Sequence, residues 1–156
     1  FTGQPAFTAD GKMAFITYDA EHKTQLTLVN GEKNYTFSIP GNRLVDMSWS
    51  PDGNTLAVST SKASDYSGRV LESKLILVTF PINVDIPVTY TDVVPEHLVW
   101  SPDGKSILTI SRNMVDGRYQ VNFVVFDIDK RRELPASGFS LTSEKYLFIE
   151  PIFWLP

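Results

Sequence analysis

The stretch that decides the fold is a five-residue signature, Trp-Ser-Pro-Asp-Gly, which occurs at residues 49–53 and again at residues 100–104. A related form, Phe-Thr-Ala-Asp-Gly, occupies residues 7–11. The aromatic residues that begin these segments are 42 and 51 residues apart, and Trp-Leu-Pro at 154–156 has the position of a fourth copy. Such a period indicates that the chain is built from internal repeats.

The signature predicts a tight turn between two strands. Its Pro presets φ for the second turn position, its Ser or Asp can bond nearby backbone N–H groups, and its Gly closes the turn at little steric cost. The aromatic residue in front can pack its ring into a seam between adjacent sheets. We therefore expect Trp49, Trp100 and Trp154 to be core residues, and their repeat spacing disfavours the alternative of a ligand-stacking role.

Short β-rich stretches follow one another along the chain, separated by turn signals such as Asn-Gly and Asp-Gly, and no helical periodicity interrupts them. The predicted strands are 13–18, 25–29, 35–39, 44–49, 55–60, 74–80, 106–111 and 119–128. Together with the period, they predict an all-β chain: a partial β-propeller of about three four-stranded antiparallel blades.

The repeats divide a single domain, residues 1–156, into 5–41, 42–94 and 95–150, with the start of a fourth at 151–156. Propellers close with four to eight blades, and an open blade leaves an unpaired surface. We therefore expect that the chain is cut from a longer protein and that its open blade edges lead to self-association. The alternatives are that two or more chains complete a larger assembly, or that three blades persist as an open arc.

The two full signatures, each followed by an alternating strand at 55–58 or 106–110, resemble the propeller repeats of TolB-like proteins, which are relatives of WD-type repeats. The resemblance covers nearly the whole chain, although the first copy departs from it with Phe7 and Ala9. It implies a part of a larger bacterial protein with a periplasmic or otherwise extracytoplasmic location.

Composition excludes several classes of function. The net charge is −4, which disfavours nucleic acid as a partner. The absence of cysteine excludes thiol chemistry and thiolate metal sites. No apolar run approaches the length of a membrane span, so no membrane insertion by this chain is expected. The basic run at 130–132 is predicted to be a solvated hairpin turn, with an anion site as the alternative.

A search for catalytic patterns gives negative results. His22 and His97 are 75 residues apart, without metal-ligand spacing. The Gly-Lys-Ser at 104–106 lacks the earlier Gly of a phosphate-binding loop, and no Gly-x-Ser-x-Gly elbow is present. Asp127 and Asp129 could bind a cation or act as acid and base, but a charged hairpin is the favoured reading. We expect no enzyme activity and no catalytic, cofactor or metal site.

Two segments exceed simple hairpin turns, residues 61–73 and 81–96, and binding residues concentrate in such loops. Tyr66, Arg69 and Tyr90 are therefore candidate interaction residues, with variable connectors as the alternative. The leading hypothesis is a non-catalytic protein-interaction or sensor domain, such as the extracytoplasmic region of a membrane-anchored transcriptional regulator. The alternatives are the propeller domain of a prolyl-oligopeptidase-like serine peptidase, and a propeller enzyme with an active site shared among blades.

Overall fold

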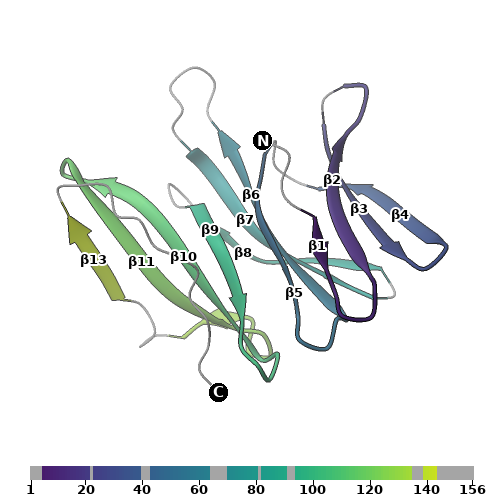
Figure 1. Cartoon of the computed structure of the whole chain (residues 1–156). Helices are drawn as coiled ribbons and strands as arrows, with labels where there is room; N and C mark the ends of the chain where they lie inside the picture. The colour runs from purple at the N-terminus through teal and green to yellow at the C-terminus, as the bar shows by residue number, and fades with distance from the viewer. Residues whose placement is uncertain are drawn as a thin grey trace.

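Three antiparallel sheets stand side by side in the computed structural model (Figure 1). The structure describes residues 5–21, 23–39, 43–63, 70–80, 82–90, 94–134 and 139–143. Within these residues every regular element is a β-strand, as the sequence predicts. Each sheet is a meander whose strands follow chain order, so each sheet forms one blade.

The three blades are made of consecutive strands. Blade 1 consists of β1 (Ala6–Phe7), β2 (Met13–Tyr18), β3 (Thr24–Asn30) and β4 (Lys33–Ser38). Blade 2 consists of β5 (Arg43–Trp49), β6 (Thr55–Ala63), β7 (Val70–Thr79) and β8 (Asn83–Tyr90). Blade 3 consists of β9 (Val94–Trp100), β10 (Ser106–Val115), β11 (Arg118–Asp127), β12 (Arg132–Glu133) and β13 (Phe139–Ser143).

The outer position of blade 3 is filled by two short strands. Asp127 of β11 pairs with Arg132 of β12, while Phe123 of the same strand pairs with Phe139 of β13. Both short strands therefore run along the same edge of β11, one after the other. With β12 and β13 taken as one interrupted strand, all three blades have four strands.

The hydrophobic core lies in the two seams between blades. In seam 1–2, side chains of β2 and β3 pack against side chains of β5, β6 and β7; the buried members are Ala14, Leu26, Leu28, Ile39, Met47, Leu56, Val58, Ile76 and Val78. In seam 2–3 the buried members are Ala57, Leu75, Leu77, Leu98, Trp100, Ile107 and Phe126. Blade 2 therefore buries both of its faces, as alternation along its strands requires.

Most predicted strands are confirmed, but the two predicted long loops are largely wrong. β6 continues to Ala63 and β7 begins at Val70, so residues 61–63 and 70–73 of the loop predicted at 61–73 are strand, while 64–69 lie outside the described residues. The segment 81–96 contains all of β8 and the start of β9. Proline suggested a loop here, yet Pro87 lies in an outer strand at a register shift, where a missing N–H is tolerated.

The hairpin turns follow their sequence signals. Val115 pairs with Arg118 across a two-residue turn in which Asp116 and Gly117 have φ of 49° and 74°. Two successive positive φ values define the type I′ turn that suits the twist of antiparallel strands. The predicted Asp-Gly turn is therefore confirmed.

Candidate functional site

The three signature segments connect the first and second strands of their blades, and these turns lie along one rim, at the bottom of Figure 1. We call them turn 1 (residues 8–12), turn 2 (50–55) and turn 3 (101–106). In turn 2, the Ser50 N–H donates to the Thr55 carbonyl at 2.8 Å, and the Gly53 N–H donates to the Ser50 carbonyl at 2.8 Å. The corresponding bonds of turn 3 are both 2.9 Å.

The serine and aspartate side chains hold each turn from inside. Ser50 Oγ accepts the Thr55 N–H at 2.9 Å and donates to the Asp52 carboxylate. The hydrogen bond from Ser50, followed by that from the Asn54 N–H, lowers the pKa of Asp52. In turn 3 the hydroxyl of Ser101 lowers the pKa of Asp103 in the same way. These carboxylates are therefore ionised at neutral pH and line the rim with negative charge.

Turn 1 keeps this arrangement although its sequence departs from the signature. Thr8 replaces the serine: its Oγ1 accepts the Lys12 N–H at 2.8 Å and donates to Asp10. The turn is one residue shorter, since Thr8 pairs with the fourth residue after it and Ser50 with the fifth. Because the hydroxyl and the carboxylate survive, a turn with the same side-chain bonds forms without Pro.

A repeated hydrogen bond joins each blade to the one before it. Trp49 Nε1 donates to the Ala6 carbonyl at 3.2 Å, and Trp100 Nε1 donates to the Ser48 carbonyl at 2.9 Å. Both acceptors directly precede the signature aromatic of the earlier blade. Both indoles also pack in the seams, so the predicted core role of the two tryptophans is confirmed, while Trp154 lies outside the described residues.

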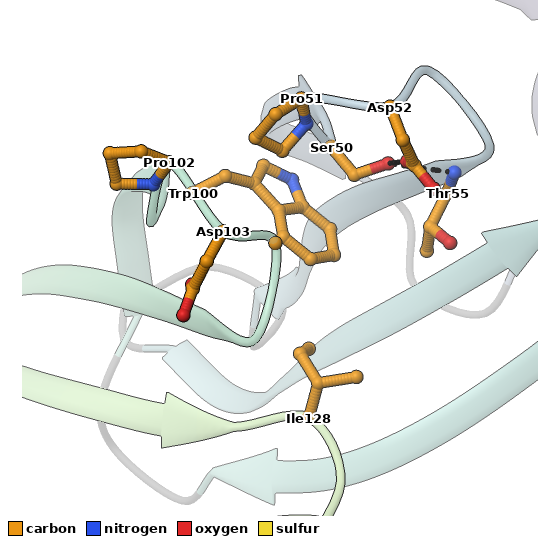
Figure 2. Close-up of a pocket in the computed structure, with 9 residues that line it drawn as sticks. Ser50, Pro51, Asp52, Thr55, Trp100, Pro102, Asp103 and Ile128 are labelled. Carbon is orange, nitrogen blue, oxygen red and sulfur yellow. Dashed lines mark hydrogen bonds between the residues drawn. The ribbon is translucent and has the colours of Figure 1, made fainter.

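Each seam opens at the rim into a small cleft beside the tryptophan. Cleft 1, between turns 1 and 2, has a volume of about 300 Å³. Cleft 2, between turns 2 and 3, has a volume of about 200 Å³. Figure 2 shows the Trp100 ring in cleft 2, with Pro51 of turn 2 on one side and Pro102 and Asp103 of turn 3 on the other. Two neighbouring clefts are therefore related by the repeat.

Lys12 ties turn 1 to turn 2. Its residue is only 9% exposed, and its Nζ lies 2.6 Å from Asp10 Oδ2 and 3.0 Å from the Gly53 carbonyl oxygen. A nearly buried ammonium group needs such partners to offset its lost hydration. The turns are close here, since a Cβ added at Gly53 would lie 3.3 Å from Thr8 Cγ2, which is a tight contact.

The innermost strands of blades 2 and 3 carry a bulge at the same repeat position. The register with the next strand shifts beside Val45 in β5 and beside Glu96 in β9. The residue after each bulge, Asp46 or His97, lies three positions before the tryptophan. Bulges of this kind reorient side chains and occur often beside functional sites.

Asp46 is held across seam 2–3 by the backbone amide of Leu98. Its Oδ2 accepts the Leu98 N–H at 2.8 Å, and the Met47 N–H also lowers its pKa. Burial nevertheless dominates and raises the pKa of Asp46, while the charge of His97 acts in the opposite direction. Because its oxygens bind amides that stabilise the seam, Asp46 fits a structural role better than that of a catalytic acid or base.

The side chains of the sequence-predicted interaction residues are not among those that the structure describes. Tyr66 and Arg69 lie outside the described residues, as does His22. Tyr90 is the last residue of β8, where its backbone pairs with Ser73, and its side chain is not among those described. The rim clefts were not predicted from the sequence, although the signature turns flank them.

The basic run and the paired aspartates form the predicted charged hairpin. Lys130 donates to Asp127 from both its N–H and its Nζ, at 2.9 and 2.8 Å. Arg131, in a left-handed conformation with φ of 53°, donates to Asp85 of blade 2 at 2.6 Å. The hairpin therefore also links the outer parts of blades 2 and 3.

The described ranges hold neither a metal-binding cluster nor a helix that could span a membrane. No group of three or more His, Cys, Asp or Glu side chains there could hold a metal ion. No helix among those residues has the length and hydropathy to cross a membrane.

The chain matches no family model and no curated protein, but it does match solved structures. One is the β-propeller domain of the Trilobed protease from Pyrococcus furiosus, with 15% identity and a TM-score of 0.61 over 90% of this chain and 42% of that one. Another is Pyrococcus horikoshii acylaminoacyl peptidase, with 11% identity and a TM-score of 0.62 over 90% of this chain and 25% of that one.

TolB from Acinetobacter baumannii also matches, with 15% identity and a TM-score of 0.49 over 92% of this chain and 43% of that one. We draw nothing further from this weaker match. The chain spans less than half the length of each of these proteins. At these identities the stronger matches show the fold alone, and they confirm the predicted partial propeller. The described part of this chain is therefore a β-propeller segment of three consecutive blades.

Proposed function

We propose that this propeller segment is a non-catalytic protein-interaction module. The observation that carries the proposal is the pair of repeat-related clefts on one rim, each held between two hydrogen-bonded turns. Rigid sheets that present short turns are a common basis for recognition. Asp46, whose pKa is raised by burial, is better explained by support of the seam than by a catalytic role.

Within this proposal the segment is the extracytoplasmic sensor region of a membrane-anchored bacterial transcriptional regulator. The support is the resemblance of the signatures at 49–53 and 100–104 to repeats that occur in such regions and in periplasmic proteins. A partner would then bind on the rim, and the conformational change caused by its binding would pass to another part of the larger protein.

The second candidate is the propeller domain of a serine peptidase. The likeness in fold to the Trilobed protease and to acylaminoacyl peptidase favours it. Fold alone does not fix function, since one architecture serves many activities. This candidate requires a Gly-x-Ser-x-Gly hydrolase domain elsewhere in the parent protein.

We also propose self-association through the open face of blade 1. Phe7 pairs with Met13 on this face, just as Trp49 pairs with Leu56 on the face that blade 2 buries against blade 1. Phe7 is 65% exposed, whereas Trp100 at the same repeat position is 8% exposed. Burying such an aromatic ring stabilises an interface.

The first test is the sequence of the parent protein together with labelling by a fluorophosphonate probe, which reacts with active-site serines. A membrane span with a DNA-binding domain and no labelling is the expected result. A labelled hydrolase domain would replace the interaction proposal with the peptidase candidate.

Light scattering tests the open face of blade 1. The expected result is a concentration-dependent mass above that of one chain, which Phe7→Glu reduces to the monomer value. Tyr18→Glu is the matched control, because Tyr18 is also an exposed aromatic residue but lies on the other face of β2. A monomer at all concentrations, or equal effects of both variants, would overturn self-association through this face.

A further inference from the structure

The residue whose N–H binds the signature hydroxyl differs among the three turns. It is Lys12 in turn 1, Thr55 in turn 2 and Ser106 in turn 3. In cleft 1 the lysine of the earlier turn crosses to the glycine carbonyl of the later turn. In cleft 2 the equivalent residue of the earlier turn is Thr55, which lines the cleft and carries no ammonium group.

Cleft 2 retains the partners that bind the ammonium group in cleft 1. Asp52 corresponds to Asp10, and Gly104 corresponds to Gly53. Asn54, the residue by which turn 2 is longer than turn 1, donates from its Nδ2 to Asp52 Oδ2 at 3.1 Å. An added Gly104 Cβ would lie 3.8 Å from its nearest neighbour, Pro51 Cδ, which is an ordinary van der Waals contact.

The walls of cleft 2 suit the side chain that carries an ammonium group. Trp100, Pro51 and Pro102 supply apolar surface, and Asp52 and Asp103 supply carboxylates. None of the described residues that line the cleft is a Lys or Arg. A lysine places its methylene groups on apolar surface and its charge near polar groups, and an aromatic ring attracts the cation.

We propose that cleft 2 binds the lysine side chain of a protein partner, in the position that Lys12 occupies in cleft 1. The ammonium group donates to the Asp52 carboxylate and to the Gly104 carbonyl, while the methylene groups pack on Trp100. The lowered pKa values of Asp52 and Asp103 keep both carboxylates charged at neutral pH. This inference rests on the proposed protein-interaction function and names the chemistry that the partner presents.

The test uses the full chain and a short probe, acetyl-Gly-Lys-Gly-amide, with its Nε-acetylated form as the matched control. Binding is followed by the NMR shifts of the Gly104 amide and the Trp100 indole N–H. We expect saturable shifts with a dissociation constant of about 1 mM for the lysine peptide, and at least about tenfold weaker binding after acetylation. Equal binding of both peptides, or no shift of either signal, would overturn the proposal.

Variants separate cleft 2 from the rest of the rim. Asp52→Asn should weaken binding at least about tenfold, since it removes the charge but keeps an acceptor for the turn. Thr55→Lys should abolish binding, because it places the chain's own ammonium group at the position equivalent to Lys12. Asp10→Asn is the control and should leave binding unchanged, since Asp10 serves cleft 1. Loss of binding with the control, or full binding with Thr55→Lys, would place the site elsewhere.

A separate outcome concerns the proposed function. A purified protein partner that binds the wild type and the Thr55→Lys variant with equal affinity would leave the interaction module in place and overturn the lysine site. If the lysine peptide binds cleft 2 but the parent protein carries the hydrolase domain, the lysine site stands and the interaction-module proposal is overturned.

Discussion

The indole Nε1 of Trp100 donates a 2.9 Å hydrogen bond to the carbonyl oxygen of Ser48, across the seam between blades 2 and 3. The bond sits within a buried cluster, so each blade is fixed to its predecessor by a directional contact as well as by apolar packing.

Trp100→Phe should lower the free energy of unfolding by about 1–3 kcal/mol, because the Ser48 carbonyl loses its partner while an aromatic ring remains. Trp100→Ala should cost about 3–5 kcal/mol, since it also leaves a cavity. Urea unfolding measures both values. Trp49→Phe is the control: its bond is longer, at 3.2 Å, and its ring is half-buried, so a smaller loss is expected. Identical stability of Trp100→Phe and the wild type would contradict a stabilising role for the bond.

Gly53→Ala should destabilise the protein more than Gly31→Ala. Both glycines have positive φ, 66° and 60°, so both substitutions cost about 1–2 kcal/mol in the backbone. Only at Gly53 does the new Cβ meet a neighbour, Thr8 Cγ2 at 3.3 Å, which adds about 1 kcal/mol of overpacking. Thermal or urea unfolding of the two variants gives the comparison. Equal losses would show that turns 1 and 2 are not in close contact.

The carboxylates of turns 2 and 3 should make the protein less stable in acid. The serine hydroxyls hold the pKa values of Asp52 and Asp103 below the ordinary 3.8. A depressed folded-state pKa gives stability that is present above the unfolded value and lost as the pH falls through the folded value. The unfolding free energy should therefore fall below about pH 4. In an NMR titration, Ser101→Ala should raise the pKa of Asp103, and an unchanged pKa would exclude the hydroxyl as its cause.

Asp46 should show the opposite dependence. Burial raises its pKa, so its contribution is most favourable while it is protonated and declines as the pH rises from the unfolded value through the folded value. Asp46→Asn keeps an acceptor for the Leu98 N–H and should be neutral or stabilising at pH 7. Asp46→Ala leaves that N–H without an acceptor and should cost about 1–3 kcal/mol. Urea unfolding at two pH values tests the pair, and a destabilised Asp46→Asn would show that the charge itself supports the seam.

The turns were predictable from the sequence because their chemistry is local. The hydrogen bonds that close turn 2 join residues that are at most five positions apart, between Ser50 and Thr55. The same holds for Asp116-Gly117. The strand extensions were less visible, since Ser61 and Ser73 suggest a loop although both are buried in strands.

The clefts and the seam bonds could not be predicted, since they join residues of different blades. Lys12 contacts Gly53, which is 41 residues away, and Asp46 contacts Leu98 across 52 residues. Their pairing follows from how two sheets face each other, which no local pattern specifies. The repeat does give one clue: residues at equal positions in successive turns become neighbours.

The tryptophan bond gives the chain a direction of assembly. In both seams the indole comes from the later blade and the carbonyl from the earlier one. Because synthesis proceeds from the N-terminus, the accepting sheet emerges from the ribosome before the donor that docks on it. Each new blade thus meets a template already in place, and growth can proceed sheet by sheet without waiting for residues still to be translated.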